Sequence, residues 1–310
     1  MDEILELLGR CLDAPAMTRP ALLRHNRNRA VQASLSIEGN TLSLQDVAAI
    51  ATGLRPLSAQ PREVLEVENA LALYEQSSDF VVFSRKDLLR AHGILMRGLI
   101  DHAGHLRTGG VGIGRGRKII HVAPPAKRVP ELVDDLLEFL KDGEGHWLVR
   151  SCVFHYEFEF IHPFADGNGR MGRFWQTLFL AKQRPILGII PVEAILKERQ
   201  KDYYEVLEAA DRAGDSTVFV EFMLKAIRDA LAGAISQLTI RARPEDRLEQ
   251  ARGMFASAWF ERRQYLALFT RLAPLTASRD LAHGVNLSLL ERKGILRNAR
   301  YRFLNPQGKN

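Results

Sequence analysis

Residues 162–173 gather more side chains able to do chemistry than any other stretch of the chain, and they read His-Pro-Phe-Ala-Asp-Gly-Asn-Gly-Arg-Met-Gly-Arg. The unperturbed pKa of a histidine side chain lies near neutral pH, so the imidazole of His162 can take a proton from a hydroxyl group. Asp166 offers a hard oxygen ligand, which suits Mg²⁺ bound together with phosphates and water. Gly167 and Gly169 allow a tight turn and a close approach of the backbone to a ligand.

The second half of this stretch is suited to binding anions. A helix beginning near Gly169 would direct its free N–H groups and the positive end of its dipole at the loop, where Asn168 can also donate from its side-chain amide. Arg170 and Arg173 are three residues apart and share one face of such a helix, and guanidinium groups bind phosphate through paired hydrogen bonds. Each piece alone has an ordinary explanation: His-Pro-Phe as the entry to a loop, Gly-Asn-Gly as a turn, and the arginine pair as a solvated helix face. Together they predict phosphoryl or nucleotidyl transfer, in which the protein supplies position and electrostatics.

The stretch resembles the signature of the Fic (Fic/Doc) family, His-x-Phe-x-Asp/Glu-Gly-Asn-Gly-Arg-x-x-Arg, and matches every specified position. The resemblance implies a mainly helical protein that transfers AMP from ATP to a Ser, Thr or Tyr hydroxyl of a target protein and releases pyrophosphate. It implies that His162 is the general base. It also implies that Asp166 holds Mg²⁺ on the α- and β-phosphates.

The same resemblance implies roles for the rest of the loop. Gly167, Asn168 and Gly169 would form the anion hole, and Arg170 and Arg173 would hold the β- and γ-phosphates. The Doc branch of the family transfers phosphate and lacks the Gly-Asn-Gly loop. The presence of that loop here favours nucleotide transfer.

A second stretch, residues 34–40, reads Ser-Leu-Ser-Ile-Glu-Gly-Asn and resembles the family's inhibitory motif. Ser34 and Glu38 are four residues apart and therefore neighbours on one helix face. The resemblance implies that Glu38, at the end of a helix over about residues 18–39, pairs with Arg173 and blocks productive ATP binding. An ordinary helix C-terminus would show a similar pattern. Beside the signature, inhibition is the favoured interpretation.

Two further features bear on the ligands. Residues 104–122 predict a short glycine-rich β-hairpin, which resembles the family's flap that aligns the target segment by strand addition, although an ordinary surface hairpin would look the same. In the family, the region after the signature helps to hold the adenosine, which makes Tyr203 and Tyr204 candidates for nucleotide binding. An aromatic core position on a helix explains these tyrosines equally well.

The elements that must position these residues are mostly helices. The active loop is expected to join two core helices, over residues 143–161 and 169–181. His155, in the first of them, is expected to be a packed or partly exposed histidine and not a metal ligand. Further helices are expected over residues 1–12, 18–38, 44–51, 62–76, 84–96, 129–140, 197–213 and 217–239.

The C-terminal end differs in charge from the rest of the chain. Residues 241–310 hold 14 Lys and Arg against 6 Asp and Glu, a formal charge of +8, whereas the whole chain carries +6. Helices are expected over residues 260–272 and 276–293, with a break at 284–286, and a β wing over 301–304. This pattern resembles the winged helix-turn-helix that some bacterial Fic proteins carry, and the basic excess suits DNA. A structural or dimerising module with a solvated basic face is the alternative.

We therefore expect a mainly α protein with a Fic-type helical core, a small β-hairpin flap and a small winged helix-turn-helix-like domain. The expected boundaries are residues 1–95 for an N-terminal helical region with the inhibitory helix, 96–240 for the catalytic core and following helices, and 245–310 for the winged-helix-like domain. A hydrophobic content of 46% and a charged content of 26% are typical of soluble globular proteins.

Cysteine usage and apolar runs bear on location. Cys11 and Cys152 are too few for a disulfide framework and lack metal-ligand spacing, which fits a reducing compartment. No N-terminal signal pattern is found, and the most apolar stretch, residues 185–196, is interrupted by Pro191 and Glu193 and cannot span a bilayer. We expect a cytoplasmic protein with no membrane partner, and a homodimer stays open.

Two classes of function compete at this point. The first is a Mg²⁺- and ATP-dependent protein adenylyltransferase restrained by Glu38, whose fold could also run the reverse reaction and remove AMP from a target. The second is a DNA-binding regulator in which the same fold senses nucleotide. The intact signature over residues 162–173 favours the enzyme.

Overall fold

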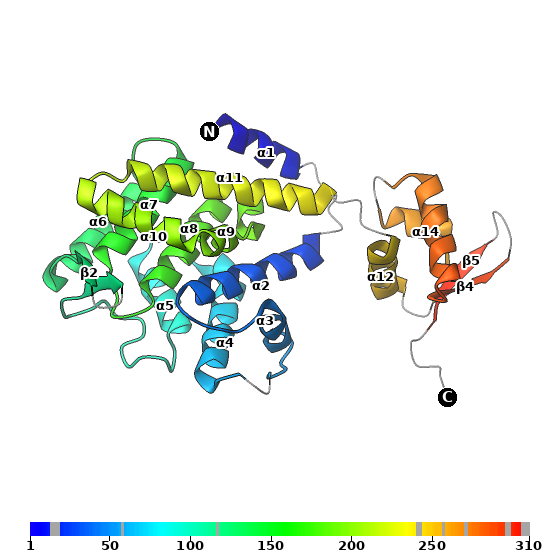
Figure 1. Cartoon of the computed structure of the whole chain (residues 1–310), viewed down its shortest axis with the longest axis horizontal. Coiled ribbons are helices and arrows are strands. Elements are labelled where there is room, and N and C mark those ends of the chain that lie inside the picture. Colours follow the sequence, from blue (N-terminus) through cyan, green and yellow to red (C-terminus); the bar gives the residue numbers. More distant parts are fainter. Residues whose placement is uncertain are drawn as a thin grey trace. The chain divides into compact units, whose positions relative to one another are not determined.

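The computed structural model describes residues 1–12, 19–56, 59–115, 118–239, 244–255, 258–269, 272–294 and 299–304. The chain divides into two compact units (Figure 1). The first comprises Met1–Leu12 and Ala21–Gly233, and the second contains the chain from Ala234 to the C-terminus.

The first unit is almost entirely helical, which confirms the expected fold class. Its α-helices are α1 (Asp2–Leu12), α2 (Arg19–Ile37), α3 (Leu44–Ile50), α4 (Pro61–Glu75), α5 (Arg85–Leu95), α6 (Val129–Asp142), α7 (Trp147–Ile161), α8 (Asn168–Gln183), α9 (Val192–Glu198), α10 (Gln200–Ala213) and α11 (Thr217–Thr239). The expected hairpin is present as β1 (Gly112–Arg115) and β2 (Lys118–Val122), paired antiparallel with an irregularity between Ile113 and Gly114. The helix expected over residues 197–213 is wrong in one respect, because the chain leaves helical geometry at Arg199 and forms α9 and α10.

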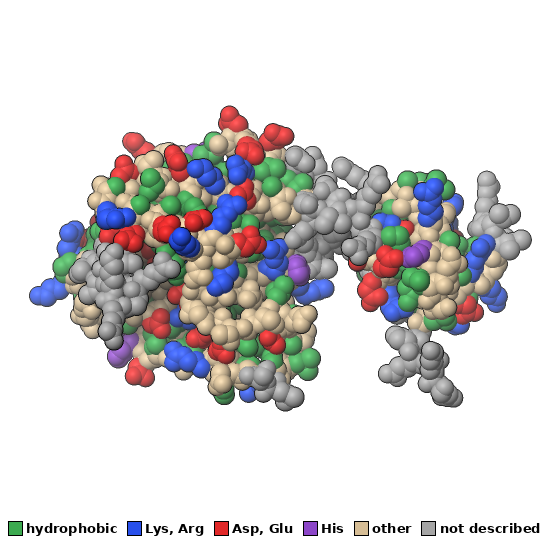
Figure 2. Space-filling view, in the orientation of Figure 1, with side chains coloured by type: hydrophobic (Ala, Val, Ile, Leu, Met, Phe, Trp, Pro, Cys, Tyr) green, Lys and Arg blue, Asp and Glu red, His purple; other side chains and the backbone are tan. Residues whose placement is uncertain are grey.

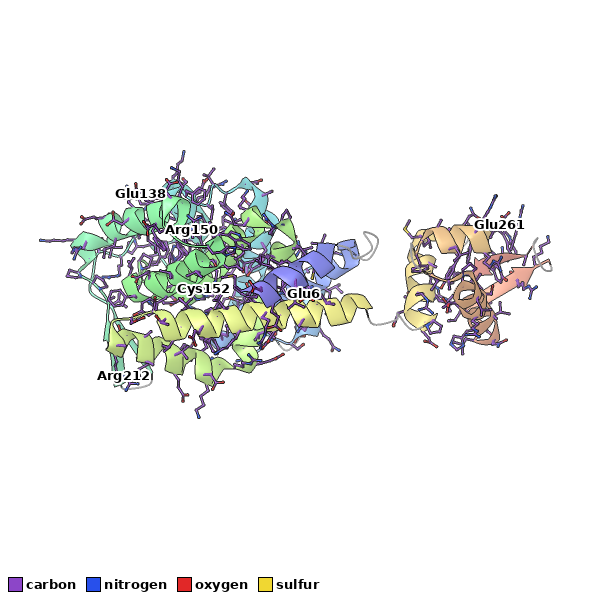
Figure 3. All side chains as sticks on the ribbon, turned by 90° about the horizontal axis from the view of Figure 1, so that it is seen from above. Glu6, Glu138, Arg150, Cys152, Arg212 and Glu261 are labelled. Atoms are coloured by element: carbon purple, nitrogen blue, oxygen red, sulfur yellow. The ribbon has the colours of Figure 1, made fainter. Side chains whose placement is uncertain are left out.

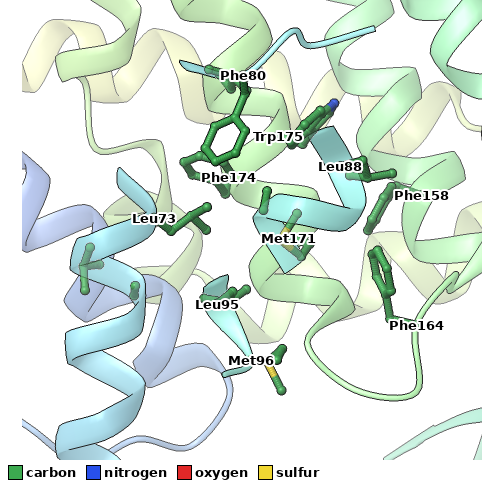
Figure 4. Close-up of a cluster of buried hydrophobic side chains, with 14 of the residues drawn as sticks. Leu73, Phe80, Leu88, Leu95, Met96, Phe158, Phe164, Met171, Phe174 and Trp175 are labelled. Carbon is green, nitrogen blue, oxygen red and sulfur yellow. The ribbon is translucent and has the colours of Figure 1, made fainter. Parts of the chain in front are cut away.

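The helices α7 and α8 carry the loop of interest between them and lie in the centre of the unit. Buried apolar side chains from α4, α5, α7, α8 and the loops between them form one cluster around these helices (Figure 4). Trp175 on α8 is fully buried, and its indole N–H donates to the carbonyl oxygen of Val82 at 2.9 Å. Phe164, inside the loop, is also fully buried. The loop is therefore anchored to the core by one of its own residues, and burying a phenylalanine side chain is worth roughly 1.5–3 kcal/mol.

The start of α7 is tied to the end of α6. The guanidinium of Arg150 donates to the carbonyl oxygens of Leu140 (3.3 Å) and Lys141 (2.8 Å), which belong to the last turn of α6 (Figure 3). A helix C-terminus leaves carbonyl groups without intrahelical partners, and a cation there also interacts favourably with the helix dipole. Cys152, two residues after Arg150 on α7, is fully buried, and this burial raises the pKa of its thiol to about 12.

The second unit is small and mixed. It contains α12 (Pro244–Phe255), β3 (Phe260–Glu261), α13 (Arg262–Ala267), α14 (Pro274–Asn286), β4 (Leu290–Lys293) and β5 (Arg300–Phe303). The strands form an antiparallel sheet in the order β3-β5-β4. Its core includes Leu248, Phe260, Tyr265, Leu281 and Phe303.

Two expectations for this unit are corrected. Residues 260–261 are a strand and not the start of a helix, because they pair with β5. The helix expected over residues 276–293 ends at Asn286, where Ser288 takes a positive φ of 56°, and Leu290–Lys293 continues as a strand. The expected break at 284–286 is thus the end of the helix. Residues 295–298, part of the segment compared with a winged helix, lie outside the described residues.

On the face of the molecule shown in Figure 2, Lys and Arg side chains are interspersed with Asp and Glu side chains. In the described part of the chain, no helix has the length and apolar character needed to cross a membrane.

Candidate functional site

His162 follows directly on α7 and has a left-handed backbone conformation, with φ 50° and ψ 62°. Such a conformation is uncommon for a residue other than glycine and costs roughly 1–3 kcal/mol. The ring nitrogen Nδ1 lies 3.3 Å from the carbonyl oxygen of Glu159, which can only accept a hydrogen bond. Nδ1 therefore carries the proton, and Nε2 keeps the lone pair that a general base needs.

Arg107 holds the backbone around His162 in place. The guanidinium donates to four backbone carbonyls, those of Gly109 (2.8 Å), Pro124 (2.5 Å), Ile161 (3.2 Å) and His162 (2.8 Å). Burial lowers the pKa of Arg107 from its ordinary value, but arginine stays charged at any physiological pH. No sequence motif marks Arg107 as a functional residue, because its partners are backbone groups up to 55 residues away.

Asn168 closes the loop between α7 and α8. Its side-chain oxygen accepts from the N–H of Phe164 at 2.8 Å, and its side-chain nitrogen donates to the carbonyl oxygen of Phe164 at 2.9 Å. Asn168 is only 2% exposed. The side-chain nitrogen carries two N–H groups and Phe164 accepts from one of them, so the role of this amide as a donor to a bound anion stays a prediction. Backbone N–H groups at the start of α8 are further donors in the loop.

His92, on α5, contacts the loop over residues 162–167 through Phe164 and the backbone of Asp166. Its ring is stacked on Phe164 with centroids 3.7 Å apart. Nδ1 accepts from the N–H of Gly104 at 2.9 Å, so the proton is on Nε2, which donates to the carbonyl oxygen of Asp166 at 3.0 Å. Burial is the main cause that lowers the pKa of His92, to about 4. His92 is thus a neutral positioning residue, and no local sequence pattern singles it out.

We expect His92 to make the chain acid-sensitive. The unfolded chain protonates this histidine near pH 6.5 and the folded chain only near pH 4, so the free energy of unfolding falls as the pH drops through this window, by up to about 3 kcal/mol. Urea unfolding at pH 7 and pH 4.5 measures the loss. The loss should be smaller in His92→Gln than in wild type, and unchanged in His102→Gln, which alters an exposed histidine. An equal loss in all three proteins would contradict the assignment.

Asp166 faces outward from the loop and its side chain is 49% exposed. One carboxylate oxygen accepts from the N–H of Gly167 at 2.6 Å and from the guanidinium of Arg170 at 3.1 Å. Mg²⁺ is commonly held by one or two carboxylates together with phosphates and water. Among the residues that the structure describes, no group of three or more His, Cys, Asp or Glu side chains could hold a metal ion. An exposed carboxylate such as that of Asp166 suits Mg²⁺ bound together with phosphate oxygens.

Gly167 and Gly169 must lack a side chain for different structural reasons. Gly167 precedes α8 with φ 83°, and a Cβ atom there would lie 2.7 Å from the sulfur of Met96. Gly169 is in the first turn of α8, and a Cβ there would lie 2.5 Å from Oε1 of Glu38 and 2.9 Å from the guanidinium of Arg173. Gly169 therefore leaves room at the helix N-terminus, where a negative charge is favoured. In this structure the carboxylate of Glu38 lies there.

Arg173 connects α8 to α2. Its guanidinium donates to the hydroxyl of Ser34 at 3.0 Å, to the carbonyl oxygen of Ser34 at 3.1 Å and to Oε1 of Glu38 at 2.7 Å. Arg173 is 2% exposed. Burial acts to lower its pKa, but the neighbouring carboxylates, Glu38 first, raise it above its ordinary value. The structure thus contains the Glu38–Arg173 pair that the resemblance implied.

Glu159 is a second carboxylate near Arg173 that the sequence analysis missed. It lies on α7, and its buried Oε1 has no hydrogen-bond partner. Burial raises the pKa of Glu159 to about 7, Arg173 acts to lower it, and Glu38 raises it further. Arg173 therefore interacts with two carboxylates, that of Glu38 in the turn after α2 and that of Glu159 on α7.

Tyr203 lies in the core and away from solvent. It is 1% exposed, and its hydroxyl is 3.0 Å from Nε2 of His155, whose Nδ1 is 2.6 Å from the side-chain oxygen of Gln176. The role predicted for Tyr203 in nucleotide binding is not supported by this burial, and the core interpretation of both Tyr203 and His155 is. Tyr204 is partly exposed and stays a candidate.

The structure thus brings together most of the residues singled out in the sequence. Those assembled in one place are Ser34, Glu38, His162, Asp166, Gly167, Asn168, Gly169, Arg170 and Arg173. They come from α2 and the turn that follows it, from the loop over residues 162–167, and from the first turns of α8.

Comparison with known proteins agrees with this geometry. Residues 82–180 match the family model described as Fic/DOC family. A crystal structure of a Fic family protein from Desulfovibrio desulfuricans G20 is 44% identical, with a TM-score of 0.75, and covers 100% of this chain and 95% of that one. A Fic domain containing signaling protein from Bacteroides thetaiotaomicron is 16% identical with a TM-score of 0.66 over 76% of this chain and 96% of that one, and supports the fold alone.

Curated relatives carry an activity in their names. The protein adenylyltransferase fic-1 of Caenorhabditis elegans is 30% identical over 204 residues, which are 62% of this chain and 38% of that protein. The protein adenylyltransferase Fic of Nematostella vectensis is 26% identical over 255 residues, 77% of this chain and 56% of that protein. The chain thus spans between 38% and 56% of the length of these two relatives.

Proposed function

The chain belongs to the Fic family, and on this premise we propose that it is a protein adenylyltransferase that transfers AMP from ATP to a Ser, Thr or Tyr hydroxyl of a target protein. The observation that carries the proposal is the loop over residues 162–173. It sets an imidazole with an acceptor Nε2, an outward-facing carboxylate and a glycine-lined helix N-terminus beside two arginines.

Each of these groups has a role in the transfer. Nε2 of His162 takes the proton of the attacking hydroxyl, whose oxygen forms a bond to the α-phosphorus while the bond to the β-phosphate breaks and pyrophosphate leaves. Arg170 and Arg173 bind the charged phosphates. Asp166 would hold Mg²⁺, which when bound neutralises phosphate charge. The backbone N–H groups at the start of α8 face the developing charge.

The proposal includes a self-restrained state. Glu38 places a carboxylate against Arg173 and above Gly169, where a phosphate group of the nucleotide would be bound. Two anions compete for one guanidinium, so nucleotide binds productively only when Glu38 leaves.

Intact mass spectrometry of the Glu38→Gly protein tests the activity and the donor. The protein is incubated with ATP, GTP, CTP or UTP, each with Mg²⁺ or with EDTA, alone and with a cell lysate. We expect a gain of one AMP moiety per modified site with ATP and Mg²⁺, and none with EDTA. A gain from another nucleotide would correct the donor. No transfer to the protein itself or to any lysate protein, with any nucleotide, would contradict the proposed function.

The same site could remove AMP from a modified target. The side chain of Glu38 is 34% exposed and lies beside the loop, so its carboxylate could orient a water molecule for attack. AMP released from a labelled target by wild type, but not by Glu38→Gly, would assign this reverse activity.

We propose DNA binding by the second unit as a second candidate function. Its order of helix, strand, two helices and two strands, with the sheet order β3-β5-β4, is compatible with a winged helix-turn-helix. Arg262 on α13 and Arg279 on α14 are exposed. We expect binding to duplex DNA that weakens with salt and weakens further in Arg279→Ala. No binding to DNA at low salt would exclude this function.

A further inference from the structure

The C-terminal end of α2 is held by side chains from the junction of α9 and α10. The ammonium group of Lys197 donates to the carbonyl oxygen of Ser36 at 2.9 Å. The side-chain amide of Gln200 donates to the carbonyl oxygen of Ile37 at 3.0 Å. Lys197 also donates to the side-chain oxygen of Gln200 at 2.9 Å, which joins the two side chains into one unit.

These contacts satisfy groups that a helix end leaves open. The last carbonyls of an α-helix have no intrahelical partner, and a cation there interacts favourably with the negative end of the dipole. Ser36 and Ile37 are the last two residues of α2, and Glu38 follows directly after them. The backbone turns sharply here, since the N–H groups of Glu38 and Asn40 both donate to the carbonyl oxygen of Leu35 and Gly39 has φ 97°. The position of the Glu38 carboxylate is therefore set by where this helix end is held.

The opposite side of the turn is held by α4. The side-chain amide of Asn40 donates to Oε2 of Glu66 at 2.9 Å and to the carbonyl oxygen of Glu63 at 3.2 Å. Oε1 of Glu66 lies 3.9 Å from the guanidinium of Arg170. The turn after α2 is thus fixed from two directions. On the α4 side Glu66 also reaches Arg170, whereas on the α9–α10 side Lys197 and Gln200 bind the end of α2 and each other.

We propose that Lys197 and Gln200 form a latch that positions Glu38 against Arg173 and thereby sets how strongly the chain restrains its own activity. The inference rests on the proposed function and adds to it two positioning residues outside the signature and outside the inhibitory motif. Their hydrogen bonds go to α2, to each other and, for Gln200, to Tyr204. Loss of the latch should weaken the Glu38–Arg173 pair and leave the transfer chemistry intact.

The test compares latch variants in two backgrounds. In the chain with Glu38 present, Lys197→Met and Gln200→Leu should each raise the initial rate of AMP transfer with ATP and Mg²⁺ by about three- to tenfold, as expected for the loss of one hydrogen bond, with the larger effect for the charged lysine. In the Glu38→Gly background neither should change the rate. Lys197→Arg keeps a cation at this place and should stay close to wild type.

Lys201→Met is the matched control. Lys201 is on α10, its side chain is 75% exposed, and it is paired only loosely with Glu205 at 3.7 Å. This variant removes the same charge from the same helical region without touching α2. Its rate should equal that of wild type in both backgrounds.

Hydrogen exchange gives a readout that does not depend on activity. Backbone amides of residues 33–41 should exchange faster in Lys197→Met than in Lys201→Met or wild type. Unchanged exchange overturns the latch, and so does a rate increase of the same size in both backgrounds, because the lysine would then act on the chemistry itself. A silent Glu38→Gly protein would refute the proposed function, and the exchange comparison would still decide whether the latch holds α2.

Discussion

Glu38→Gly is expected to raise the rate of AMP transfer by about ten- to a hundredfold over the unmodified chain. In the structure, Oε1 of Glu38 accepts from the buried guanidinium of Arg173 at 2.7 Å. A hydrogen bond to a charged group is worth roughly 1.5–3 kcal/mol, and a nucleotide must displace this one before its own phosphate can bind Arg173. Initial rates of label incorporation at low ATP concentration measure the effect, and it should shrink as the ATP concentration rises.

Two variants separate charge from shape in this experiment. Glu38→Gln keeps the side-chain volume and removes the negative charge, so its rate should lie between those of wild type and Glu38→Gly. Glu68→Gln removes a carboxylate from an exposed pair with Arg55, and its rate should equal that of wild type. If Glu38→Gly were no faster than wild type, the Glu38–Arg173 pair would be a structural contact and not a restraint.

The residues of the site were predictable where chemistry depends on local sequence. His162, Asp166, Gly167 and Arg170 lie within nine residues of one another, so their types and spacing alone indicate an anion site with a base beside it. The pairing of Glu38 with Arg173, which are 135 residues apart, could not come from spacing. It was expected only because each belongs to a motif that resembles the family's.

The supporting residues could not be predicted, because what defines them is a tertiary contact. Arg107 and His92 donate to backbone carbonyls 55 and 74 residues away. Because every residue has a backbone carbonyl, no sequence pattern shows which of them is contacted. Asn168 illustrates a different limit. Its type suits an anion site, but the direction of its side chain depends on how the loop closes on Phe164. The same is true of Tyr203, which is buried through contacts with His155 on α7 and Phe219 on α11.

The C-terminal unit contains strands that are too short to be predicted from the periodicity of apolar residues. Residues 290–293 continue an apolar and charged pattern that suits a helix, yet they pair with β5 after the left-handed turn at Ser288. The two-residue strand β3 is too short to show an alternating pattern. By contrast, α2, α7 and α8 are long enough for their spacing to predict them.

His162→Ala, made in the Glu38→Gly background, is expected to lower the rate of AMP transfer by about a hundred- to ten-thousandfold, the usual contribution of a positioned general base. His162 takes no part in holding the Arg173 guanidinium, so the affinity for ATP should change little. The loss should therefore fall on kcat and not on KM.

The backbone at His162 decides which variant gives the cleaner result. Its φ of 50° disfavours alanine, whereas asparagine tolerates the left-handed region. The guanidinium of Arg107 donates to the backbone carbonyl of His162 and not to its side chain, so this hydrogen bond should survive either change. His162→Asn should therefore unfold at the temperature of the parent protein and still lose transfer. His102→Ala, at an exposed position, should lose neither. Transfer that persists in a well-folded His162→Asn protein would show that another group takes the proton, and the role assigned to His162 would have to be withdrawn.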